Sequence, residues 1–460
     1  MSKQDKKELR QQIACEWLEE NYLNYGSLRH DVVTDRLQIR IADSLSAPHN
    51  ATSVIGDPAE DASLQNAPEG LQFRGKENWR NLTDKDINTM VCQCVAEKGV
   101  NISTNEMWTA LKSDMVPAVH PLREWLNGLQ PWSSNEPDWI DLVAQKVRVK
   151  PSGEEAKGDK ARGEELWRAC FKKWFVAMVA SWMKDEVVNH TVLVLVGRQG
   201  IYKTTWLDRL MPPALRAYSS KLPLSGQISK DDRLRLCENG LLNIDELDAI
   251  CGREMNIVKS LLTSTDVNER AAYGRLKERR VRLASFCAST NNREFLTDIT
   301  GNRRWLPFEV ESIQNPFEDI ILYERLYAQA KAYVECGYFA YWFDLDEIEV
   351  LEEHNEKFRV QENEEELLPI LFDKPAEDRG EFMTTAEISD RLATYGGIKK
   401  PMSIRKLNAI LERHDFKAVR PYVDGKQVRG WLVYRRKQDE IEIKQKELAN
   451  KSQRHEDILY

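Results

Sequence analysis

The sequence predicts an α/β fold, on the evidence of three short apolar runs that each end in residues capable of chemistry. Residues 192–196 are continuously apolar and β-branched, the composition of a fully buried strand. Residues 240–244 form a second apolar strand that ends in two acids, and residues 285–289 form a third that ends in Thr-Asn. A helix expected at residues 164–184 carries aromatic and apolar side chains at 3–4 spacing, which is typical of packing in a core.

The first strand leads into a glycine-bearing loop that ends in Lys203 and Thr204. Gly197 precedes Lys203 by six residues, which is the spacing of the G-x-x-x-x-G-K-[ST] phosphate-binding loop. In that loop the backbone N–H groups and the start of the next helix face the phosphates of ATP. Lys203 would contact the β- and γ-phosphates, and the Thr204 hydroxyl would bind Mg²⁺. The expected nucleotide-binding residues are Gly197, Arg198, Gln199, Gly200, Ile201, Tyr202, Lys203, Thr204 and Thr205.

One position departs from the phosphate-loop pattern. Tyr202 stands where the pattern has its second glycine, directly before Lys203. Gly200, two residues earlier, is an alternative source of the flexibility that this glycine provides. The alternative explanation of the whole segment is an ordinary buried strand and tight turn before an amphipathic helix.

The second strand ends in Asp245 and Glu246. P-loop ATPases need a carboxylate at the end of a strand to hold Mg²⁺ and a neighbouring carboxylate to activate the attacking water. The order of this pair assigns the Mg²⁺ contact to Asp245 and water activation to Glu246. A solvated helix start with Asp245 as its N-cap is the competing interpretation.

The third strand and the segment after it supply further polar side chains. The amide of Asn291 follows the strand and is a candidate for orienting the attacking water or contacting the γ-phosphate. Arg303 and Arg304 follow the turn residue Gly301 and precede another strand. A paired arginine in this position suits an arginine finger that acts in trans on a neighbouring subunit. Two solvent-facing arginines at the start of a strand are the alternative.

The order and spacing of these elements resemble the virulence-associated protein E (VapE-like) family of P-loop ATPases, which is similar to the superfamily 3 helicases of viruses, phages and plasmids. The resemblance covers roughly residues 79–310 and is weaker upstream of the first strand. It implies an AAA+/superfamily 3-like ATPase core that uses ATP and Mg²⁺, with a hexameric ring favoured. The matching motifs are G-x-Q-G-x-x-K-T at 197–204, I-D-E-L at 244–247, A-Y-G-R at 272–275, T-N-x-x-x-F-L-T-D at 290–298 and T-G-N-R-R-W at 300–305.

Two short β-like runs around Gly274 predict a hairpin between the second and third strands. The resemblance to superfamily 3 helicases implies that this hairpin lines a central pore and grips single-stranded DNA. A positive surface that follows the DNA backbone, with an aromatic side chain for stacking, fits that role. For Arg275, a place at the subunit interface near the neighbour's nucleotide is an equal alternative. The expected DNA contacts are Arg270, Tyr273, Arg275, Lys277 and Arg279.

Composition limits the class of protein. The 460 residues suggest about three domains, and 42% hydrophobic with 30% charged residues is the profile of a soluble globular protein. No apolar stretch approaches the length of a membrane span, and the start does not look like a signal peptide. The eight cysteines are scattered without CxxC spacing, which argues against zinc and favours free thiols in a reducing cytoplasm.

The net charge of −8 hides a contrast near the C-terminus. Residues 344–378 hold 14 acidic and 3 basic side chains, and we expect an acidic connector there, either a solvated linker or an exposed helix. Residues 379–437 hold 14 basic and 6 acidic side chains, which favours an anion-binding module.

The basic block has the pattern of a winged helix. Helices are expected at residues 385–395 and 403–414, and strands at 416–422 and 427–434 flank a hairpin turn signal. Arg405 and Lys406 lie in the first turn of the second helix, where recognition helices contact DNA. A protein-interaction module of the same fold is the alternative. The expected duplex-DNA contacts are Arg405, Lys406, Lys426 and Arg429.

The N-terminal part is expected to be a mixed α/β domain, with helices near 16–25, 84–98 and 105–112 and a strand at 35–41, and no chemistry can be assigned to it. The predicted organisation is an N-terminal domain at 1–132, a linker at 133–163, the ATPase core at 164–343, the acidic connector at 344–378, the basic domain at 379–437 and a charged tail at 438–460.

These features favour an ATP-dependent DNA translocase, a ring-forming replicative helicase of a mobile element or phage. One alternative is a DNA-bound ATPase that uses nucleotide as a switch in replication initiation or phage defence without unwinding. A second alternative is a degenerate scaffold that binds nucleic acid and hydrolyses nothing, for which Tyr202 is the main support.

Overall fold

The structure is a computed structural model of the whole chain. It divides into two compact units, Met1–Asn291 with Trp305–Glu347, and Asn292–Arg304 with Ile348–Tyr460. The residues whose structure is described are 3–41, 79–150, 160–222, 229–244, 247, 252–269, 278–296, 302–360, 363–375, 380–423 and 425–456.

The N-terminal part of the first unit combines a small sheet with three helices. The sheet has the order β3-β2-β1-β4, in which β4 is parallel to β1 and the other pairs are antiparallel. A capping box at Thr83 starts α2, and another at Ser103 starts α3, so local sequence sets where both helices begin. These elements confirm the mixed α/β prediction, although the first helix begins well before residue 16. The elements are α1 (Lys3–Leu18), η1 (Glu19–Leu23), β1 (Leu28–Asp31), β2 (Arg36–Arg40), β3 (Trp79–Asn81), α2 (Asp84–Lys98), α3 (Thr104–Leu111) and β4 (Ala118–Val119).

A six-stranded sheet forms the centre of the first unit, with the order β5-β12-β6-β11-β8-β7. All neighbours are parallel except β5, which is antiparallel to β12. The three predicted strands are confirmed as β6, β8 and β11, and their residues are all buried. The strands are β5 (Val147–Val149), β6 (Val192–Val196), β7 (Ser219–Lys221), β8 (Leu241–Ile244), β11 (Ser285–Thr290) and β12 (Trp305–Ile313).

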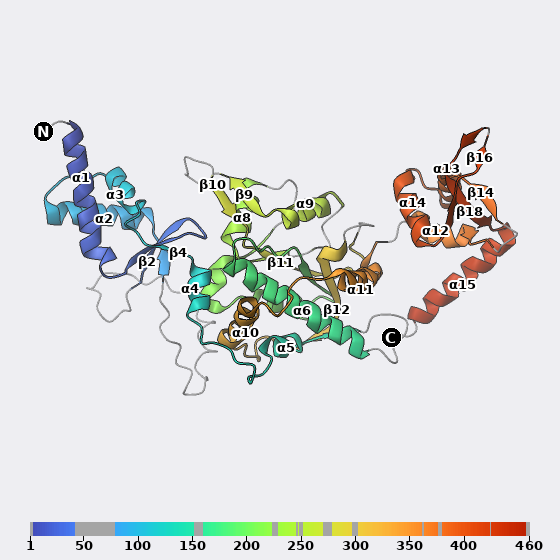
Figure 1. Cartoon of the computed structure of the whole chain (residues 1–460), viewed down its shortest axis with the longest axis horizontal. Helices are drawn as coiled ribbons and strands as arrows, with labels where there is room; N and C mark the ends of the chain where they lie inside the picture. The colour runs from blue at the N-terminus through green and yellow to red at the C-terminus, as the bar shows by residue number, and fades with distance from the viewer. Residues whose placement is uncertain are drawn as a thin grey trace. The chain divides into compact units, whose positions relative to one another are not determined.

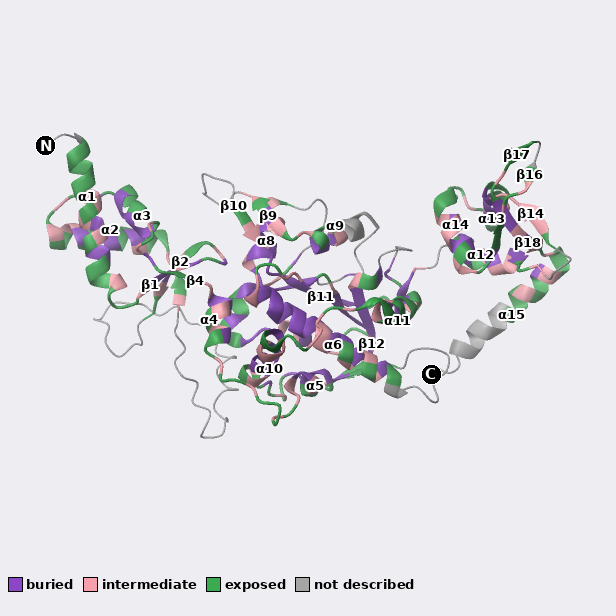
Figure 2. Ribbon diagram, viewed as in Figure 1, coloured by how far each residue is buried: buried purple, intermediate pink, exposed green. Residues whose placement is uncertain are grey.

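Helix α6 (Lys160–Met183) runs across this sheet (Figure 1) and carries the predicted aromatic stripe. Trp174 and Trp182 are fully buried, and their indole N–H groups donate to backbone carbonyls of Phe286 and Gly240. A Cβ at Gly240 would lie 2.8 Å from the Trp182 ring, so the helix approaches β8 closely only because residue 240 is glycine. The stripe therefore packs the core, as the periodicity predicts, and much of α6 and β11 is coloured as buried in Figure 2.

Shorter helices complete the first unit. Helix α10 lies against α6, where Tyr327 stacks on Trp182. The helices are α4 (Pro121–Asn127), α5 (Trp139–Ala144), α7 (Lys203–Asp208), η2 (Pro213–Tyr218), α8 (Lys230–Glu238), α9 (Gly252–Thr263) and α10 (Tyr323–Cys336).

The hairpin predicted around Gly274 is confirmed in its two strands, β9 (Asp266–Glu269) and β10 (Glu278–Val281), which pair antiparallel. Directly after β10, the fully buried guanidinium of Arg282 donates to the backbone carbonyls of Leu261, Leu262, Ser264, Ala284 and Asn189 at 2.7–3.3 Å. Burial lowers the pKa of Arg282 to about 9, so the group still carries its charge at neutral pH.

The second unit contains a small antiparallel sheet in which β18 pairs with β13, β14 and β15, together with a separate ribbon of β16 and β17. Helices α12, α13 and α14 bury their apolar faces in one core with this sheet. The elements are α11 (Leu345–Asn355), η5 (Glu356–Phe358), α12 (Asn363–Leu371), β13 (Phe372–Asp373), β14 (Glu381–Met383), α13 (Thr385–Gly396), α14 (Ile404–Arg413), β15 (Lys417–Val419), β16 (Tyr422–Val423), β17 (Lys426–Gln427), β18 (Gly430–Arg435) and α15 (Gln438–Glu456).

Two expectations for this unit are wrong. The acidic stretch is not a solvated linker: its first part forms α11, which keeps several acids exposed as the exposed-helix alternative expected, and Leu368, Leu371 and Phe372 further on are buried in the core of the unit. The expected single hairpin is interrupted, because β15 pairs with β18 while Tyr422 and Val423 turn out into the β16–β17 ribbon.

No helix in the described segments is long and apolar enough to cross a membrane. Within those segments there is also no group of three or more His, Cys, Asp or Glu residues that could hold a metal ion.

Candidate functional site

The loop between β6 and α7 lies at the carboxyl end of the sheet. The backbone N–H of Gly197 donates to the Thr290 carbonyl at 3.1 Å, which ties the start of the loop to the end of β11. A Cβ at Gly197 would lie 3.1 Å from both Ile201 Cδ1 and the Val310 carbonyl oxygen. Glycine therefore lets the loop turn tightly against β12, as the phosphate-loop pattern requires.

Lys203 is the central side chain of the site and is 7% exposed. Its ammonium donates to the carbonyls of Gly197 at 2.6 Å and Arg198 at 2.7 Å, inside the loop. It also donates to Asn291 Oδ1 at 3.0 Å. The structure thus brings together two residues that the sequence assigned separately to the site.

Sheet topology explains this meeting. Val196 at the end of β6 is paired with Thr290 at the end of β11, although 94 positions separate them in the printed sequence. Ligands of α/β sheets bind at the carboxyl ends of the strands, where loops from neighbouring strands converge. The pairing of β6 with β11 places Lys203 and Asn291 at one such edge.

The hydroxyl of Thr204 lies 3.0 Å from the hydroxyl of Ser289. Ser289 is a site residue that the sequence did not indicate, because it is one of several small polar positions in β11 and matches no residue of the phosphate-loop pattern. Asn243 on β8 is similar, because it is a polar position within an apolar strand and is 1% exposed. Its side-chain N–H donates to Asp208 Oδ1 at 2.6 Å, which connects β8 to α7, whereas its buried Oδ1 accepts no hydrogen bond from the described residues.

Tyr202 adopts the left-handed backbone conformation, with φ 67° and ψ 17°. Gly200 in the same loop has φ 85°. Both positions therefore have a positive φ: Gly200 adopts it as a glycine can, and Tyr202 also takes up a backbone geometry that glycine adopts without strain. The Tyr202 ring is 39% exposed and meets the Phe317 ring edge to face, with centroids 6.3 Å apart.

This loop and its neighbouring strands belong to a recognisable family. Residues 159–360 match the family model described as the virulence-associated protein E-like domain. The chain contains a VapE-like domain. The match confirms the resemblance over this stretch and continues beyond residue 310, whereas the weaker similarity upstream of residue 159 lies outside it.

Solved structures similar to this chain include two of the NrS-1 C-terminal region. The apo structure of region 305–718 has 10% sequence identity and a TM-score of 0.43, over 89% of this chain and 97% of that chain. Its A form has 12% identity and a TM-score of 0.42, over 91% and 98% of the two chains. No curated protein matches this chain.

Several residues assigned to the VapE-like domain from sequence lie outside the described residues. Asp245 and Glu246 follow directly after β8, whose last residue Ile244 pairs with Ala288 of β11. Four of the hairpin residues expected to contact DNA also lie outside the described part of the chain, namely Arg270, Tyr273, Arg275 and Lys277.

Arg279 is on β10, and its guanidinium lies 3.0 Å from Asp266 across the hairpin. Arg303 and Arg304 form part of η4 (Asn302–Arg304) in the second unit, where Arg303 is exposed and Arg304 half-buried. The Asn302 carbonyl accepts a bond of 2.9 Å from the Asn355 amide, which fixes this turn to the end of α11.

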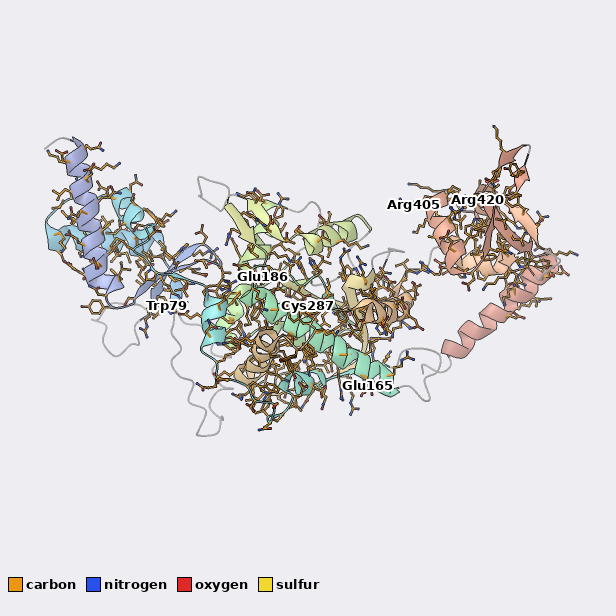
Figure 3. All side chains as sticks on the ribbon, viewed as in Figure 1. Trp79, Glu165, Glu186, Cys287, Arg405 and Arg420 are labelled. Carbon is orange, nitrogen blue, oxygen red and sulfur yellow. The ribbon has the colours of Figure 1, made fainter. Side chains whose placement is uncertain are left out.

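The basic residues of the C-terminal module differ in their surroundings. Arg405 projects from α14 and is exposed (Figure 3), whereas Lys406 is half-buried. Lys426 is exposed on β17. Arg429 is ion-paired with Glu412 at 2.7 Å, so the carboxylate offsets the positive charge that Arg429 presents to a ligand. Arg420, just after β15, is an exposed basic side chain that the sequence analysis did not single out (Figure 3).

A buried ion cluster joins the acidic stretch to the basic module. The Glu365 carboxylate is 5% exposed and pairs with the Arg359 guanidinium, while Arg413 Nη1 lies 3.4 Å away. Burial would raise the pKa of Glu365, but bonds from His414 and Arg359 outweigh it and lower that pKa to about 2. This cluster explains why the acidic stretch folds with the module instead of remaining solvated.

Proposed function

We propose that this protein is an ATP-dependent DNA translocase, a ring-forming helicase that serves the replication of a mobile element or phage. The single observation that carries the proposal is the contact between Lys203 and Asn291 at 3.0 Å. P-loop ATPases hold and sense the γ-phosphate with a lysine in a glycine-bearing loop and an amide at the end of the strand that neighbours it in the sheet. The VapE-like domain supports the link to mobile elements.

The surroundings of Lys203 suit an exchange of ligands. Its ammonium is held by the loop carbonyls of Gly197 and Arg198, at 2.6 and 2.7 Å. Phosphate oxygens are stronger acceptors for an ammonium than neutral carbonyls, because they carry charge. ATP can therefore replace these carbonyls as the acceptor without leaving the buried charge unpaired.

Magnesium would be held by Thr204 and Asp245, with Ser289 beside the threonine. Hydroxyl and carboxylate oxygens are hard ligands of the kind that Mg²⁺ prefers, and the Thr204 and Ser289 hydroxyls lie 3.0 Å apart. When bound, the ion would neutralise charge on the β- and γ-phosphates. Glu246 would accept the proton of the attacking water.

We infer that ring formation brings Arg303 or Arg304 of one subunit to the nucleotide of its neighbour. Arg303 is exposed, as an arginine that acts across a boundary must be. The guanidinium would stabilise charge that develops on the transferred phosphate group. A hexamer would create one such site at each boundary between subunits.

DNA would be contacted at two places. The hairpin of β9 and β10 would follow single-stranded DNA in the ring. We infer that the C-terminal module acts as a winged helix; α13, α14 with exposed Arg405, a small sheet and the β16–β17 ribbon with Lys426 support this. A basic helix start and a basic ribbon are suited to a groove and to the adjoining phosphates of duplex DNA.

Hydrolysis and unwinding test the proposal directly. We expect ATP hydrolysis stimulated by single-stranded DNA and strand displacement on a forked duplex. Lys203→Ala should abolish nucleotide binding, whereas Lys221→Ala, an exposed lysine of β7, should leave it unchanged. Glu246→Gln should bind ATP but hydrolyse it poorly, because only water activation is lost.

The alternatives predict different results. Stimulated hydrolysis without strand displacement would identify an ATPase switch and exclude the helicase. DNA binding without any hydrolysis would identify a scaffold, and unchanged turnover in Glu246→Gln would remove that residue from the mechanism.

A further inference from the structure

The structure holds a pair of exposed aromatic rings beside the loop that contains Lys203, and nothing in the phosphate-binding arrangement uses them. Phe317 is 72% exposed, and its partner Tyr202 directly precedes Lys203. The planes of the two rings meet at 79°, edge to face, so the rings form a corner. Aromatic rings prefer to contact other rings by stacking or edge to face, and this corner offers both.

Phe317 remains exposed although the backbone around it is firmly held. Its N–H donates to Asn315 Oδ1 at 3.1 Å. The Arg209 guanidinium, at the end of α7, donates to the carbonyls of Pro316 and Asp319. Lys146 from the loop before β5 is ion-paired with Asp319.

These bonds fix the segment without burying its aromatic ring. An exposed phenylalanine on a loose loop would be free to move with its backbone, but here the backbone that carries the ring is held. The anchor Arg209 follows α7 directly, so the segment and the Lys203 loop are held by the same short helix. Preorganised groups of this kind bind a ligand at a lower entropic cost.

Tyr202 gives a second reason to expect a ligand. A residue with a Cβ in the left-handed conformation is strained, and strain of this kind tends to persist where it has a function. Part of the side chain still faces solvent, because Tyr202 remains 39% exposed. Consecutive Cα atoms lie about 3.8 Å apart, so the Cα atom that carries the Tyr202 ring lies at this distance from the Cα atom of Lys203, the residue assigned to the phosphates.

We propose that Tyr202 and Phe317 form the base-binding corner of the nucleotide site, in which the planar base of the nucleotide stacks on the exposed aromatic face. This inference rests on the proposed nucleotide-binding function. It gives the tyrosine, which replaces a glycine of the phosphate-loop pattern, a role in base recognition. Stacking tolerates any base, so the corner would add affinity without strict selection among purines.

The experiment compares ATP with inorganic tripolyphosphate, which has the same phosphate chain but no base, by calorimetry with Mg²⁺ present. We expect the wild-type chain to bind ATP at least tenfold more tightly than tripolyphosphate. Phe317→Ala should weaken ATP binding about tenfold and leave tripolyphosphate binding unchanged, and Phe317→Trp should restore ATP binding. Ile320→Ala, which removes another exposed apolar side chain of the same segment, should change neither affinity.

Each other outcome has a definite meaning. Equal binding of ATP and tripolyphosphate by the wild-type chain, or ATP binding by Phe317→Ala at wild-type affinity, would overturn the base corner and leave the proposed function standing. An equal loss of affinity in Ile320→Ala would also overturn it, because the segment would then act only as a structural support. If the wild-type chain binds neither ligand, the proposed function fails and this inference fails with it.

Discussion

Substitutions at Tyr202 test whether its backbone is strained. At ordinary helical positions glycine is less stable than alanine, by roughly 0.8–1 kcal/mol. At a left-handed position the order reverses, because a Cβ there costs about 1–2 kcal/mol that glycine does not incur. Since Tyr202 has φ 67°, we expect Tyr202→Gly to be more stable than Tyr202→Ala. Both variants lose the contact with Phe317, so the comparison isolates the backbone.

The size of the difference follows from these two effects. Glycine also adds freedom to the unfolded chain, worth roughly 0.5–1 kcal/mol, which offsets part of the relieved strain. We therefore expect Tyr202→Gly to exceed Tyr202→Ala in free energy of unfolding by roughly 0.8 kcal/mol, the middle of a range of about 0–1.5 kcal/mol. As the control, Ala169→Gly at an exposed position of α6 should lower the free energy of unfolding by about 1 kcal/mol.

Denaturant unfolding followed by tryptophan fluorescence measures this difference. The first unit buries three tryptophans that pack against each other or against the central sheet, namely Trp167, Trp174 and Trp206. Their emission therefore reports unfolding of the unit that contains the Lys203 loop. A Tyr202→Ala variant that is as stable as Tyr202→Gly would refute the strained backbone. ATP hydrolysis by Tyr202→Gly should be preserved or raised if the tyrosine is only a tolerated variant of the pattern, whereas a folded variant that has lost ATP binding would show that the tyrosine is integral to the site.

Three further predictions concern the other parts of the chain. Arg304→Ala and Lys203→Ala should each form inactive assemblies, and mixing them should recover some ATP hydrolysis; no recovery after demonstrated subunit exchange would mean that the arginine does not act in trans. Lys426→Ala should weaken duplex-DNA binding about equally on all sequences and lower the salt slope by roughly 0.9, and an unchanged slope would exclude a phosphate contact. Because the pKa of Glu365 is about 2 when folded against an ordinary 4.5, its pairing with Arg359 should stabilise the second unit above pH 4.5, and up to about 3 kcal/mol should be lost as the pH falls from 4.5 to 2. Glu365→Gln should flatten that part of the unfolding profile measured against pH.

The central sheet could be predicted from sequence because its signals are local. Strands buried on both faces are near-continuous apolar runs; residues 192–196 show this directly, and residues 285–289 show it in their central three positions. The spacing from Gly197 to Lys203 then identified the loop. The contact between Lys203 and Asn291 was harder to foresee, because it depends on which strands are neighbours in the sheet.

The second unit shows what charge counting misses. Residues 344–378 are strongly acidic, and net charge alone predicted a solvated segment. Whether an acid is exposed depends on its partner, and the guanidinium that pairs with Glu365 can be recognised only in three dimensions. The strand order of this unit was missed for a similar reason: the turn signal near Gly425 is local, whereas the pairing of β15 with β18 is not.

The five backbone carbonyls that accept hydrogen bonds from Arg282 link the β9–β10 hairpin mechanically to its neighbours. One side chain ties the foot of the β9–β10 hairpin to the end of α9, to the segment before β6 and to the start of β11. The hairpin foot therefore cannot shift on its own, because any displacement would pull on the strands that lead to Lys203 and Asn291. Force applied to the hairpin would be transmitted through the Arg282 hydrogen bonds to the strands that end near Lys203 and Asn291. Displacement of those strands would in turn move the hairpin.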